Sequence, residues 1–398
     1  MADAGVKRGR HSYGSSAAWL VALNVIGVNL VAPTLPAYAA HYGVGIGVAS
    51  SLLTAFALAR MSMRLISGKL SDKHGSRVVC MAGGIVQTAG AVLAAMAPAF
   101  GILLAARLIQ GMGSSMFGTA VNRHLLVMTE KADLGKATAG FQSGILLGNT
   151  LGPLIGGLTA DRFGIFAPFQ VQAVITFGIV VASWRFIVDD IVEDVDKEVV
   201  AKPIRSLLAL GGFKLVMVLA FGLFFVRAGA TNVLVPAYAD DVLSLSPGQI
   251  GMIISLGSIV SLLVMAVAGR LTDTVGRRPV AMAGVFVSAF MVAAYGLANG
   301  TSQIALVAAL SGVGAGLAAV ALPTMIGDMA PPGTEGLASG LYRMANDMGW
   351  IVGPTVLGFM ADSSQYGLAF VVAGLPLLLG GLMFMATPAD RLGVARKK

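Results

Sequence analysis

The chain has 398 residues, of which 56% are hydrophobic and 12% are charged, and its mean hydropathy is +0.83. A soluble globular domain carries about 25% charged residues, so this composition excludes an ordinary soluble protein and predicts an integral membrane protein. The formal net charge is +8, but lysines and arginines collect in alternate loops, as in the cytoplasmic loops of membrane proteins. The positive charge therefore gives no support to a nucleic-acid partner.

Apolar segments long enough to cross a hydrocarbon core of ~30 Å follow one another along the chain. The first six are residues 17–38, 47–67, 79–97, 100–122, 135–160 and 166–187. After a polar interval, six more are residues 209–239, 247–268, 279–298, 303–327, 335–361 and 366–387. In lipid, each backbone amide needs a partner within the protein. We therefore predict an all-α integral membrane fold with twelve transmembrane helices in two six-helix halves.

Charged residues mark the ends and the middle of the chain. The predicted organisation is an N-terminal tail (1–16), a first six-helix half (17–188), a linker (189–208), a second six-helix half (209–387) and a C-terminal tail (388–398). Because lysine and arginine gather on both tails and on the linker, we expect both termini on the cytoplasmic side of the plasma membrane. The single cysteine excludes an internal disulfide and a cysteine-rich metal site.

The two halves repeat one another. The segment Gly68–Arg77 returns as Gly269–Arg278, displaced by 269 − 68 = 201 positions, and the same displacement relates glycines of spans 4 and 5 to glycines of spans 10 and 11. We therefore expect both halves to share one architecture. Membrane folds built from internal repeats place the substrate site at the repeat interface.

Each copy of this segment joins two spans through a very short cytoplasmic loop, in which glycines permit a tight turn. The carboxylate of Asp72 can accept hydrogen bonds from the start of an adjacent helix and can pair with Arg77, and such bonds must break when the interface opens. We predict a gating latch; the alternative is that the loop charges only fix topology. The latch residues are Gly68, Asp72, Gly75, Arg77, Gly269, Asp273, Gly276, Arg277 and Arg278.

Span 5 carries glycines four residues apart, followed by a proline and a pair of glycines. Such glycines let helices touch closely, and a membrane proline bends the helix, so packing alone explains the pattern. The residues are Gly144, Gly148, Gly152, Pro153, Gly156 and Gly157.

Charged side chains also lie within the spans. A charge near the bilayer centre costs about 2.5–3.5 kcal/mol, so we expect these residues to face a wet cavity. Arg107 and Arg227 approach mid-span with no acid on their own helix, whereas Arg343 and Asp347 are four residues apart and are alternatively an ion pair. The predicted substrate-cavity and coupling residues are Asn24, Arg60, Arg107, Gln110, Gln142, Asn149, Arg227, Arg343, Asp347 and Trp350.

These motifs resemble the signatures of the major facilitator superfamily over essentially the whole chain. The loop resembles Gly-x-Leu-Ala-Asp-Arg-x-Gly-Arg-Lys, with Ser76 in place of the usual first base and a departure at Thr274 in the second copy. Span 4, from Arg107 to Gly113, resembles Arg-x-x-Gln-Gly-x-Gly, whose arginine is implicated in proton transfer in that family. Span 5 resembles the antiporter signature Gly-x-x-x-Gly-Pro-x-x-Gly-Gly of the drug/proton antiporters.

The resemblance implies a proton-coupled exporter of amphipathic small molecules that works by alternating access, with the proton gradient as energy source and no cofactor. Small residues in spans 5 and 11 should pack the halves within one chain, so we expect a monomer, and we expect no metal. Span 1 offers only Asn24 and Asn29, so Asp347 is the favoured proton carrier. The excess of arginine over acid favours an alternative, the exchange or symport of organic anions, phosphorylated metabolites or anionic lipids. A remote alternative is an integral-membrane enzyme, although the four histidines lack ligand spacing.

Overall fold

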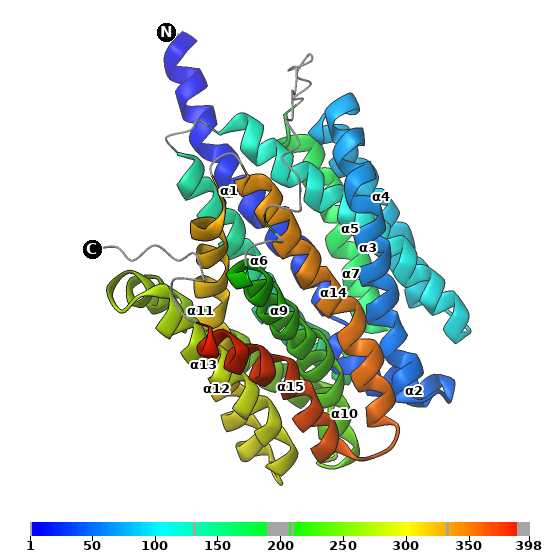
Figure 1. The fold of residues 1–398 in the computed structure, drawn as a ribbon. Coiled ribbons are helices and arrows are strands. Elements are labelled where there is room, and N and C mark those ends of the chain that lie inside the picture. Colours follow the sequence, from blue (N-terminus) through cyan, green and yellow to red (C-terminus); the bar gives the residue numbers. More distant parts are fainter. Residues whose placement is uncertain (1, 130–132, 189–206, 208–210, 332–333, 388–398) are drawn as a thin grey trace. The chain divides into compact units, whose positions relative to one another are not determined.

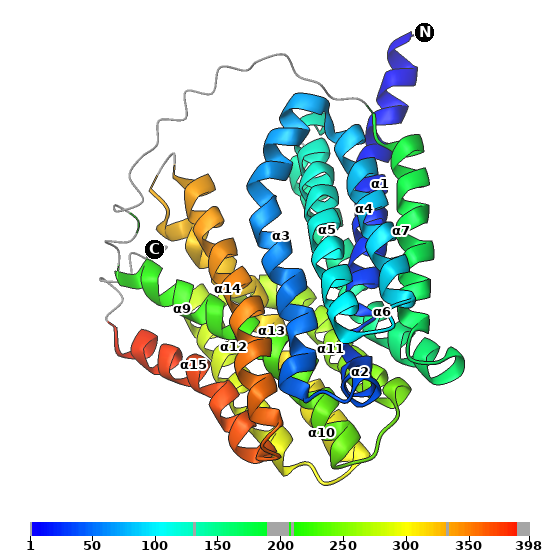
Figure 2. The same cartoon turned by 90° about the vertical axis from the view of Figure 1, so that its right-hand side faces the viewer.

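The computed structural model describes residues 2–129, 133–188, 207, 211–331 and 334–387. The predicted linker 189–208, apart from residue 207, and the predicted tail 388–398 lie outside the described residues. All regular elements within the described ranges are helices, and Figures 1 and 2 show them from two sides.

The first half contains long helices joined by short connections. Its elements are α1 (Ala2–Asn29), the 3₁₀ helix η1 (Ala32–Thr34), α2 (Leu35–Tyr42), α3 (Ile46–His74), α4 (Ser76–Ala95), α5 (Phe100–Met128), α6 (Leu134–Phe163) and α7 (Ala167–Phe186).

The second half follows the same order. Its elements are α9 (Gly211–Phe225), the π-helix η2 (Val226–Leu234), α10 (Val235–Asp241), α11 (Pro247–Thr274), α12 (Arg277–Ala294), the 3₁₀ helix η3 (Tyr295–Leu297), α13 (Thr301–Met329), α14 (Glu335–Ala361) and α15 (Tyr366–Ala386).

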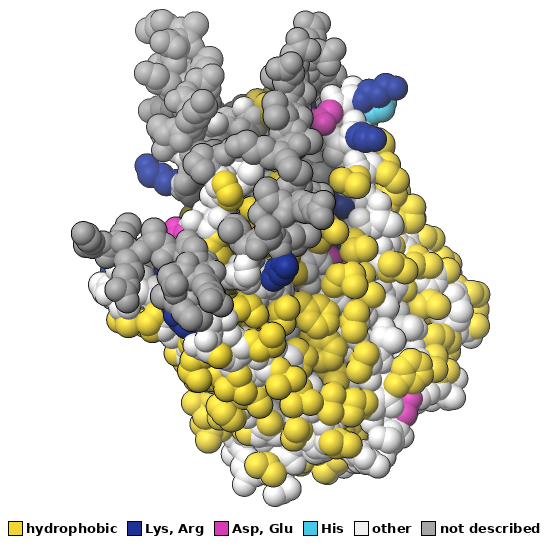
Figure 3. Space-filling view, in the orientation of Figure 1, with side chains coloured by type: hydrophobic (Ala, Val, Ile, Leu, Met, Phe, Trp, Pro, Cys, Tyr) yellow, Lys and Arg dark blue, Asp and Glu magenta, His cyan; other side chains and the backbone are white. Residues whose placement is uncertain are grey.

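Ten of the described helical segments are long and apolar enough to cross a membrane. The remaining long helices are α6 and α14, whose glycines and polar residues lower their hydropathy. Many large apolar side chains point outward, for example Leu65 at 82% and Val174 at 73% exposure. Figure 3 shows one such face, in whose lower part hydrophobic side chains dominate. An apolar exterior of this extent suits a lipid environment rather than water.

The first and seventh spans, predicted as helical over 17–38 and 209–239, each form one span in which the helix type changes. Span 1 leaves the α-helix after Asn29 and passes through η1, which contains Pro33. Span 7 changes to the π-helix η2 between α9 and α10. Proline lacks a backbone N–H and collides with the carbonyl four residues earlier, so Pro36 and Pro236 favour a break before each outer segment.

The chain forms two compact units. The first comprises residues 1–43, 51–196 and 246–255, and the second comprises 44–50, 197–245 and 256–398. Helix α3 therefore begins in the second unit and continues in the first, whereas α11 begins in the first unit and continues in the second. The second span of each half thus starts in the unit formed mainly by the other half.

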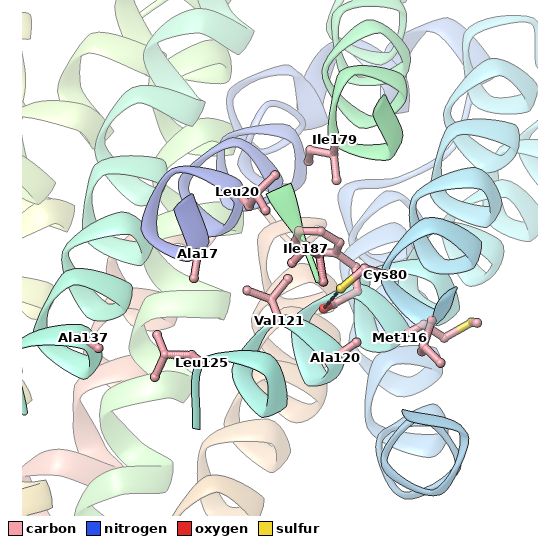
Figure 4. Packing of buried hydrophobic residues seen from close by; sticks show 12 residues of the cluster. Ala17, Leu20, Cys80, Met116, Ala120, Val121, Leu125, Ala137, Ile179 and Ile187 are labelled. Carbon is pink, nitrogen blue, oxygen red and sulfur yellow. Dashed lines mark hydrogen bonds between the residues drawn. The ribbon is translucent and has the colours of Figure 1, made fainter. Parts of the chain in front are cut away.

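Small and apolar side chains form the core of the first unit at one end of the bundle. Ala17 and Leu20 of α1, Cys80 of α4, Ala120 of α5 and Ile179 of α7 converge there, as Figure 4 shows. Small residues let helices approach closely in a membrane protein, where dispersion contacts replace much of the hydrophobic driving force.

Candidate functional site: loop latches, intramembrane charges and helix contacts

The two glycines that start α4 and α12 adopt backbone conformations that favour glycine. Gly75 has φ +79° and Gly276 has φ +103°, a region that other residues rarely enter. The tight turns predicted for the two loops therefore depend on these glycines. Gly68 and Gly269 lie earlier, within the helices α3 and α11.

The acid of the first loop pairs with a residue of span 4. Asp72 Oδ1 lies 3.0 Å from Arg123 Nε, and Arg123 Nη1 also donates to Ser76 Oγ at 3.1 Å. The sequence analysis missed Arg123, which lies on α5 in the first unit. Arg123 supplies a positive charge next to Ser76, where the family signature has its usual first base in the loop itself.

In the second loop the base comes from the loop and the acid from span 10. Arg277, the repeat counterpart of Ser76, forms an ion pair with Asp328 of α13 and donates to the carbonyl of Thr324 at 3.3 Å. Thr324 is the counterpart of Arg123, because 324 − 123 = 201. In both halves an ion pair therefore joins the loop to the fourth span of that half. The loop supplies the acid in the first half and the base in the second.

A second arginine of each loop binds the end of the last helix in its half. Arg77 Nη2 donates to the carbonyl of Trp184 at 2.8 Å. Arg278 Nη2 lies 3.0 Å from the carbonyl of Met385 and 2.8 Å from that of Thr387. The displacement of 201 relates Arg77 to Arg278 and also Trp184 to Met385. A cation at a helix C-terminus satisfies carbonyls that lack partners in the helix.

Arg107 of span 4 is almost completely buried, with 1% of its surface exposed. Its Nε donates to the carbonyl of Leu52 at 3.2 Å, and its Nη1 donates to Gln110 Oε1 at 2.6 Å. The guanidinium lies over the ring of Phe56, 4.6 Å from its centroid. Neutral acceptors and an aromatic face therefore solvate this charge, and no carboxylate among the described residues pairs with it.

The predicted polar residues of span 1 and its neighbours are joined by hydrogen bonds. Ser114 Oγ contacts Asn24 Oδ1 at 3.4 Å, and Asn29 Nδ2 donates to Asn149 Oδ1 at 3.2 Å. Gln142, also predicted as a cavity residue, is exposed on α6. These bonds cross between helices that are distant in sequence, so tertiary structure decides the partners.

The remaining predicted residues lie on three helices. Arg60 of α3 contacts the ring of Phe56 at 5.8 Å from the centroid. On α14, Arg343 is exposed, Asp347 is 5% exposed and Trp350 is half-buried. An ion pair between Arg343 and Asp347 stays a prediction. Arg227 is half-buried in the π-helix η2. No cluster of three or more potential metal ligands occurs among the described residues.

The glycines of span 5 let α6 lie directly against α1. A Cβ on Gly148 would come within 2.5 Å of Val25 Cβ, and one on Gly152 would come within 2.6 Å of Asn29 Cβ. Likewise, a Cβ on Gly156 would collide with the carbonyl of Leu30. The spacing of four residues therefore serves one continuous helix contact.

The paired glycines face different neighbours. Gly156 contacts α1, whereas a Cβ on Gly157 would collide with the backbone of Pro247 at the start of α11. Gly358, the counterpart of Gly157, contacts Ser50 near the start of α3. This contact explains why one glycine of the pair recurs in span 11.

The other glycine of the pair changes sides between the two halves. Leu357 replaces Gly156 in span 11, and Gly229 of span 7 faces it: a Cβ on Gly229 would lie 2.7 Å from Leu357 Cδ1. In the first half the small residue is Gly156 on span 5, and a Cβ there would meet the backbone of Leu30 on span 1. The glycine of this contact thus lies on span 5 in the first half and on span 7 in the second.

Two carboxylates at the ends of spans 5 and 11 cap the second spans. Asp161 Oδ2 accepts hydrogen bonds from Ser246 Oγ at 2.8 Å and from the amide of Gly248 at 3.0 Å. Asp362 Oδ2 accepts a bond from the amide of Gly47 at 3.1 Å. Asp161 and Asp362 are 201 positions apart, as are Gly47 and Gly248. A carboxylate stabilises the positive end of a helix dipole.

The sequence analysis did not single out Asp161 and Asp362. The displacement of 201 that relates Asp161 to Asp362 also relates Gly47 to Gly248, and this regularity in the sequence would have identified the four residues as a repeated motif. Each cap holds the first turn of a helix that begins in one unit and continues in the other.

Comparison with known proteins identifies the family. The family model described as Major Facilitator Superfamily matches residues 17–242 and 216–397, which is nearly the whole chain. The chain belongs to the major facilitator superfamily. It is a transporter rather than an enzyme, and its fold of two six-helix halves confirms the sequence-based prediction.

Several curated relatives match over most of their length. The chain is 26% identical to an uncharacterized transporter of this superfamily, MJ1560 of Methanocaldococcus jannaschii, over 85% of this chain and 88% of the relative. It is 25% identical to the multi-drug resistance efflux pump PmrA of Streptococcus pneumoniae, over 87% and 89%. It is 24% identical to the quinolone resistance protein NorA of Staphylococcus aureus, over 85% and 87%.

Solved structures show the same fold at low identity. A bacterial homologue of the human lysosomal transporter Spinster, in an inward-facing and occupied conformation, has a TM-score of 0.80 at 13% identity and covers 94% of this chain and 96% of its own. The nucleoside transporter NupG has a TM-score of 0.77 at 13% identity, with coverage of 94% and 99%. These similarities concern the fold alone.

Proposed function

We propose that this transporter is a proton-coupled exporter of amphipathic small molecules that works by alternating access in the plasma membrane, as a monomer with both termini in the cytoplasm. The observation that carries the proposal is the glycine run of α6, which matches the antiporter signature at each specified position and whose glycines contact α1 and the start of α11. Relatives over most of the chain are named as multidrug efflux pumps, which supports the same class of cargo.

The proton gradient is the proposed energy source, and Asp347 is the proposed proton carrier. Asp347 is 5% exposed on α14, and a buried carboxyl group near the bilayer interior is the usual kind of proton-relay residue. In the described part of span 1 the corresponding polar residues are the amides Asn24 and Asn29, which cannot exchange a proton in this way.

The test is the initial transport rate in sealed proteoliposomes, measured with an imposed proton gradient for size-matched cationic and anionic amphiphiles. The proposal expects gradient-dependent movement of at least one of them. Transport of both compounds at rates that do not change when the gradient is collapsed would contradict proton coupling, and no transport of any amphiphile would contradict the cargo class.

A second candidate keeps the fold and changes the cargo to an organic anion. Arg107 and Arg227 lie deep in their spans and have no ion pair with a carboxylate among the described residues. Preferential transport of the anionic member of the matched pair would favour this candidate, and preferential transport of the cation would contradict it.

A further inference from the structure

Span 7 contains one residue more than span 1, and the extra residue falls in the π-helix. The glycines of α6 and α14 face matching backbone positions: Gly148 faces Ala22 and Gly349 faces Phe221, while Gly152 and Gly353 face Ile26 and Phe225. The displacement in this part of the spans is 221 − 22 = 199, and also 225 − 26 = 199.

Beyond the π-helix the displacement is larger. Tyr38 packs on Phe169 at 5.4 Å between ring centroids, and Tyr238 packs on Phe370 at 5.8 Å. These tyrosines are 238 − 38 = 200 positions apart. One residue has therefore been added to span 7 between Phe225 and Tyr238, where η2 (Val226–Leu234) lies. A π-helix accommodates an added residue within a helix, and such segments occur frequently at functional sites.

The π-helix brings polar side chains onto one face. Its backbone bonds join residues five apart, as in the bond from the amide of Val235 to the carbonyl of Ala230, so residues five apart lie one above the other. Arg227 and Asn232 have this spacing. In an α-helix with 3.6 residues per turn they would point about 140° apart. Thr231, between them in height, adds a hydroxyl beside this pair.

These three polar side chains have no hydrogen bond or ion pair among the described residues. Arg227 and Thr231 are half-buried and Asn232 is 6% exposed, so bulk water does not fully solvate them. Span 1 differs in this respect, because Asn24 and Asn29 are bonded to Ser114 and Asn149. None of the side-chain nitrogen and oxygen atoms of these three residues is among the fully buried atoms that lack a hydrogen-bond partner, so this polar face is accessible to water or to a small polar group.

The opposite side of the π-helix is occupied by protein. Gly229, two residues from Arg227 and therefore about half a turn away, lies against Gly353 and Leu357 of α14. Helix α14 thus covers the side of η2 that carries Gly229, and α15 also contacts η2. A guanidinium, a hydroxyl and an amide offer several donors and one positive charge, which matches a monoanion with two acceptor oxygens.

We propose that the polar face of η2, formed by Arg227, Thr231 and Asn232, binds the carboxylate of an amphipathic organic acid and makes such acids substrates of this transporter. The guanidinium of Arg227 forms the charge-assisted bonds, while Thr231 and Asn232 fix the orientation of the carboxylate. This proposal rests on the proposed transport function and specifies one class of cargo.

The test compares binding of a fluorescent amphiphilic acid, 11-(dansylamino)undecanoic acid, with binding of its methyl ester to the purified full-length protein. The ester keeps the size and the apolar chain but lacks the charge. We expect tighter binding of the acid and, in Arg227→Gln, a loss of affinity for the acid of roughly tenfold or more, with less than about a twofold change for the ester.

Two further variants separate binding from folding. Asn232→Asp keeps the side-chain size and places a negative charge beside Arg227, so it is expected to abolish the preference for the acid. Arg185→Gln removes an arginine near the end of α7, where it contacts Phe186, and is expected to leave both affinities unchanged. The melting temperature of each variant checks that the fold is retained.

Equal loss of acid and ester affinity in a folded Arg227→Gln protein, or an unchanged affinity for the acid, would overturn the proposal. Gradient-driven transport of the ester by the same variant would show that the transport function persists. Failure of the carboxylate site and failure of the proposed exporter function are therefore distinguishable.

Discussion

At the residue scale, the charges around the two loops are complementary rather than identical. The first loop supplies the acid Asp72 and receives Arg123 from α5, whereas the second loop supplies Arg277 and receives Asp328 from α13. Asp72 is 57% exposed, so the energy of its pair is screened by water and contributes at most about 1 kcal/mol to stability. The pair is better suited to biasing a conformational equilibrium than to holding the fold.

Replacing Arg123 tests this role. Arg123→Gln is expected to change stability by less than about 1 kcal/mol and to lower the transport rate, because the loop loses its contacts to Asp72 and Ser76. In a double-mutant cycle with Asp72→Asn, the effects on the rate should not add. Additive effects on the rate would contradict coupling between the two side chains.

The caps at Asp161 and Asp362 lead to a second prediction at this scale. Asp161→Asn weakens the acceptor for the start of α11 and is expected to increase the time that this helix end spends detached. Ile250, 1% exposed in the first turns of α11, can report detachment as Ile250→Cys in a Cys80→Ser background. Maleimide labelling should be faster in Asp161→Asn than in the parent.

A matched control for this labelling experiment is Asp133→Asn. Asp133 lies in an exposed pair with Lys136 at 3.4 Å, away from α11, and its loss should leave the labelling rate of Ile250→Cys unchanged. Equal acceleration by both substitutions, or none by Asp161→Asn, would show that the cap does not hold the helix end.

At the element scale, two equivalent helix pairs pack closely with different residues at the contact. One pair is formed by spans 1 and 5, and the other by spans 7 and 11. The backbone of Leu30 lies against Gly156 in the first half, and Gly229 lies against the side chain of Leu357 in the second. Close packing requires that the volumes match across the contact, not that each position keeps its residue. For this reason the missing glycine of span 11 does not mark a loosened helix pair.

Substitutions in the first half can reproduce the residues that the second half has at this contact. Gly156→Leu alone should collide with the backbone of Leu30, directly after α1, and lower stability by about 1–3 kcal/mol or more. Adding Leu30→Gly removes the side chain that holds residue 30 in place and lets its backbone shift away from α6, so it should recover part of the loss and approach the arrangement of Gly229 and Leu357. The melting temperature in detergent measures both effects, and Gly178→Ala on α7, where a Cβ meets open space, is the control.

An identical melting temperature for the single and double variants would contradict this interpretation of the contact. Recovery by Leu30→Gly would show that the antiporter signature in α6 is, at this position, a requirement of packing. It would leave the function of the remaining glycines open to separate substitution.

At the scale of the whole molecule, two compact units exchange the first turns of α3 and α11. The proposed alternating access requires helices to move while staying folded, and α3 and α11 each contribute residues to both units. Proton coupling adds the requirement that one side chain changes its charge during the cycle.

The proposed proton carrier gives the prediction at this scale. Asp347→Asn should abolish accumulation driven by a proton gradient but retain exchange of substrate down its own gradient, because the amide cannot release a proton. Counterflow and gradient-driven uptake in the same proteoliposomes measure the two activities. Unchanged gradient-driven transport would remove Asp347 as the carrier, whereas loss of both activities would require a test of folding.

The positions of the helices could be predicted from the sequence, because length and apolar composition restrict a membrane segment to a helix. The loops at Gly75 and Gly276 followed from the repeat, and their positive φ values agree with the need for glycine. The changes of helix type in spans 1 and 7 were not predicted, although Pro36 and Pro236 were visible. A continuous apolar run does not reveal whether its backbone is α-, 3₁₀- or π-helical.

The sequence by itself therefore determined a membrane protein with two related halves, since hydrophobic length and a displacement of 201 residues are properties of the chain alone. Only the tertiary structure decided that Arg123 meets Asp72, that Gly229 makes room for Leu357, and that Arg227 shares a face with Asn232. These pairings depend on which side chains of separate helices fit in volume and charge, and on the local helix type. That information arises only when the helices pack.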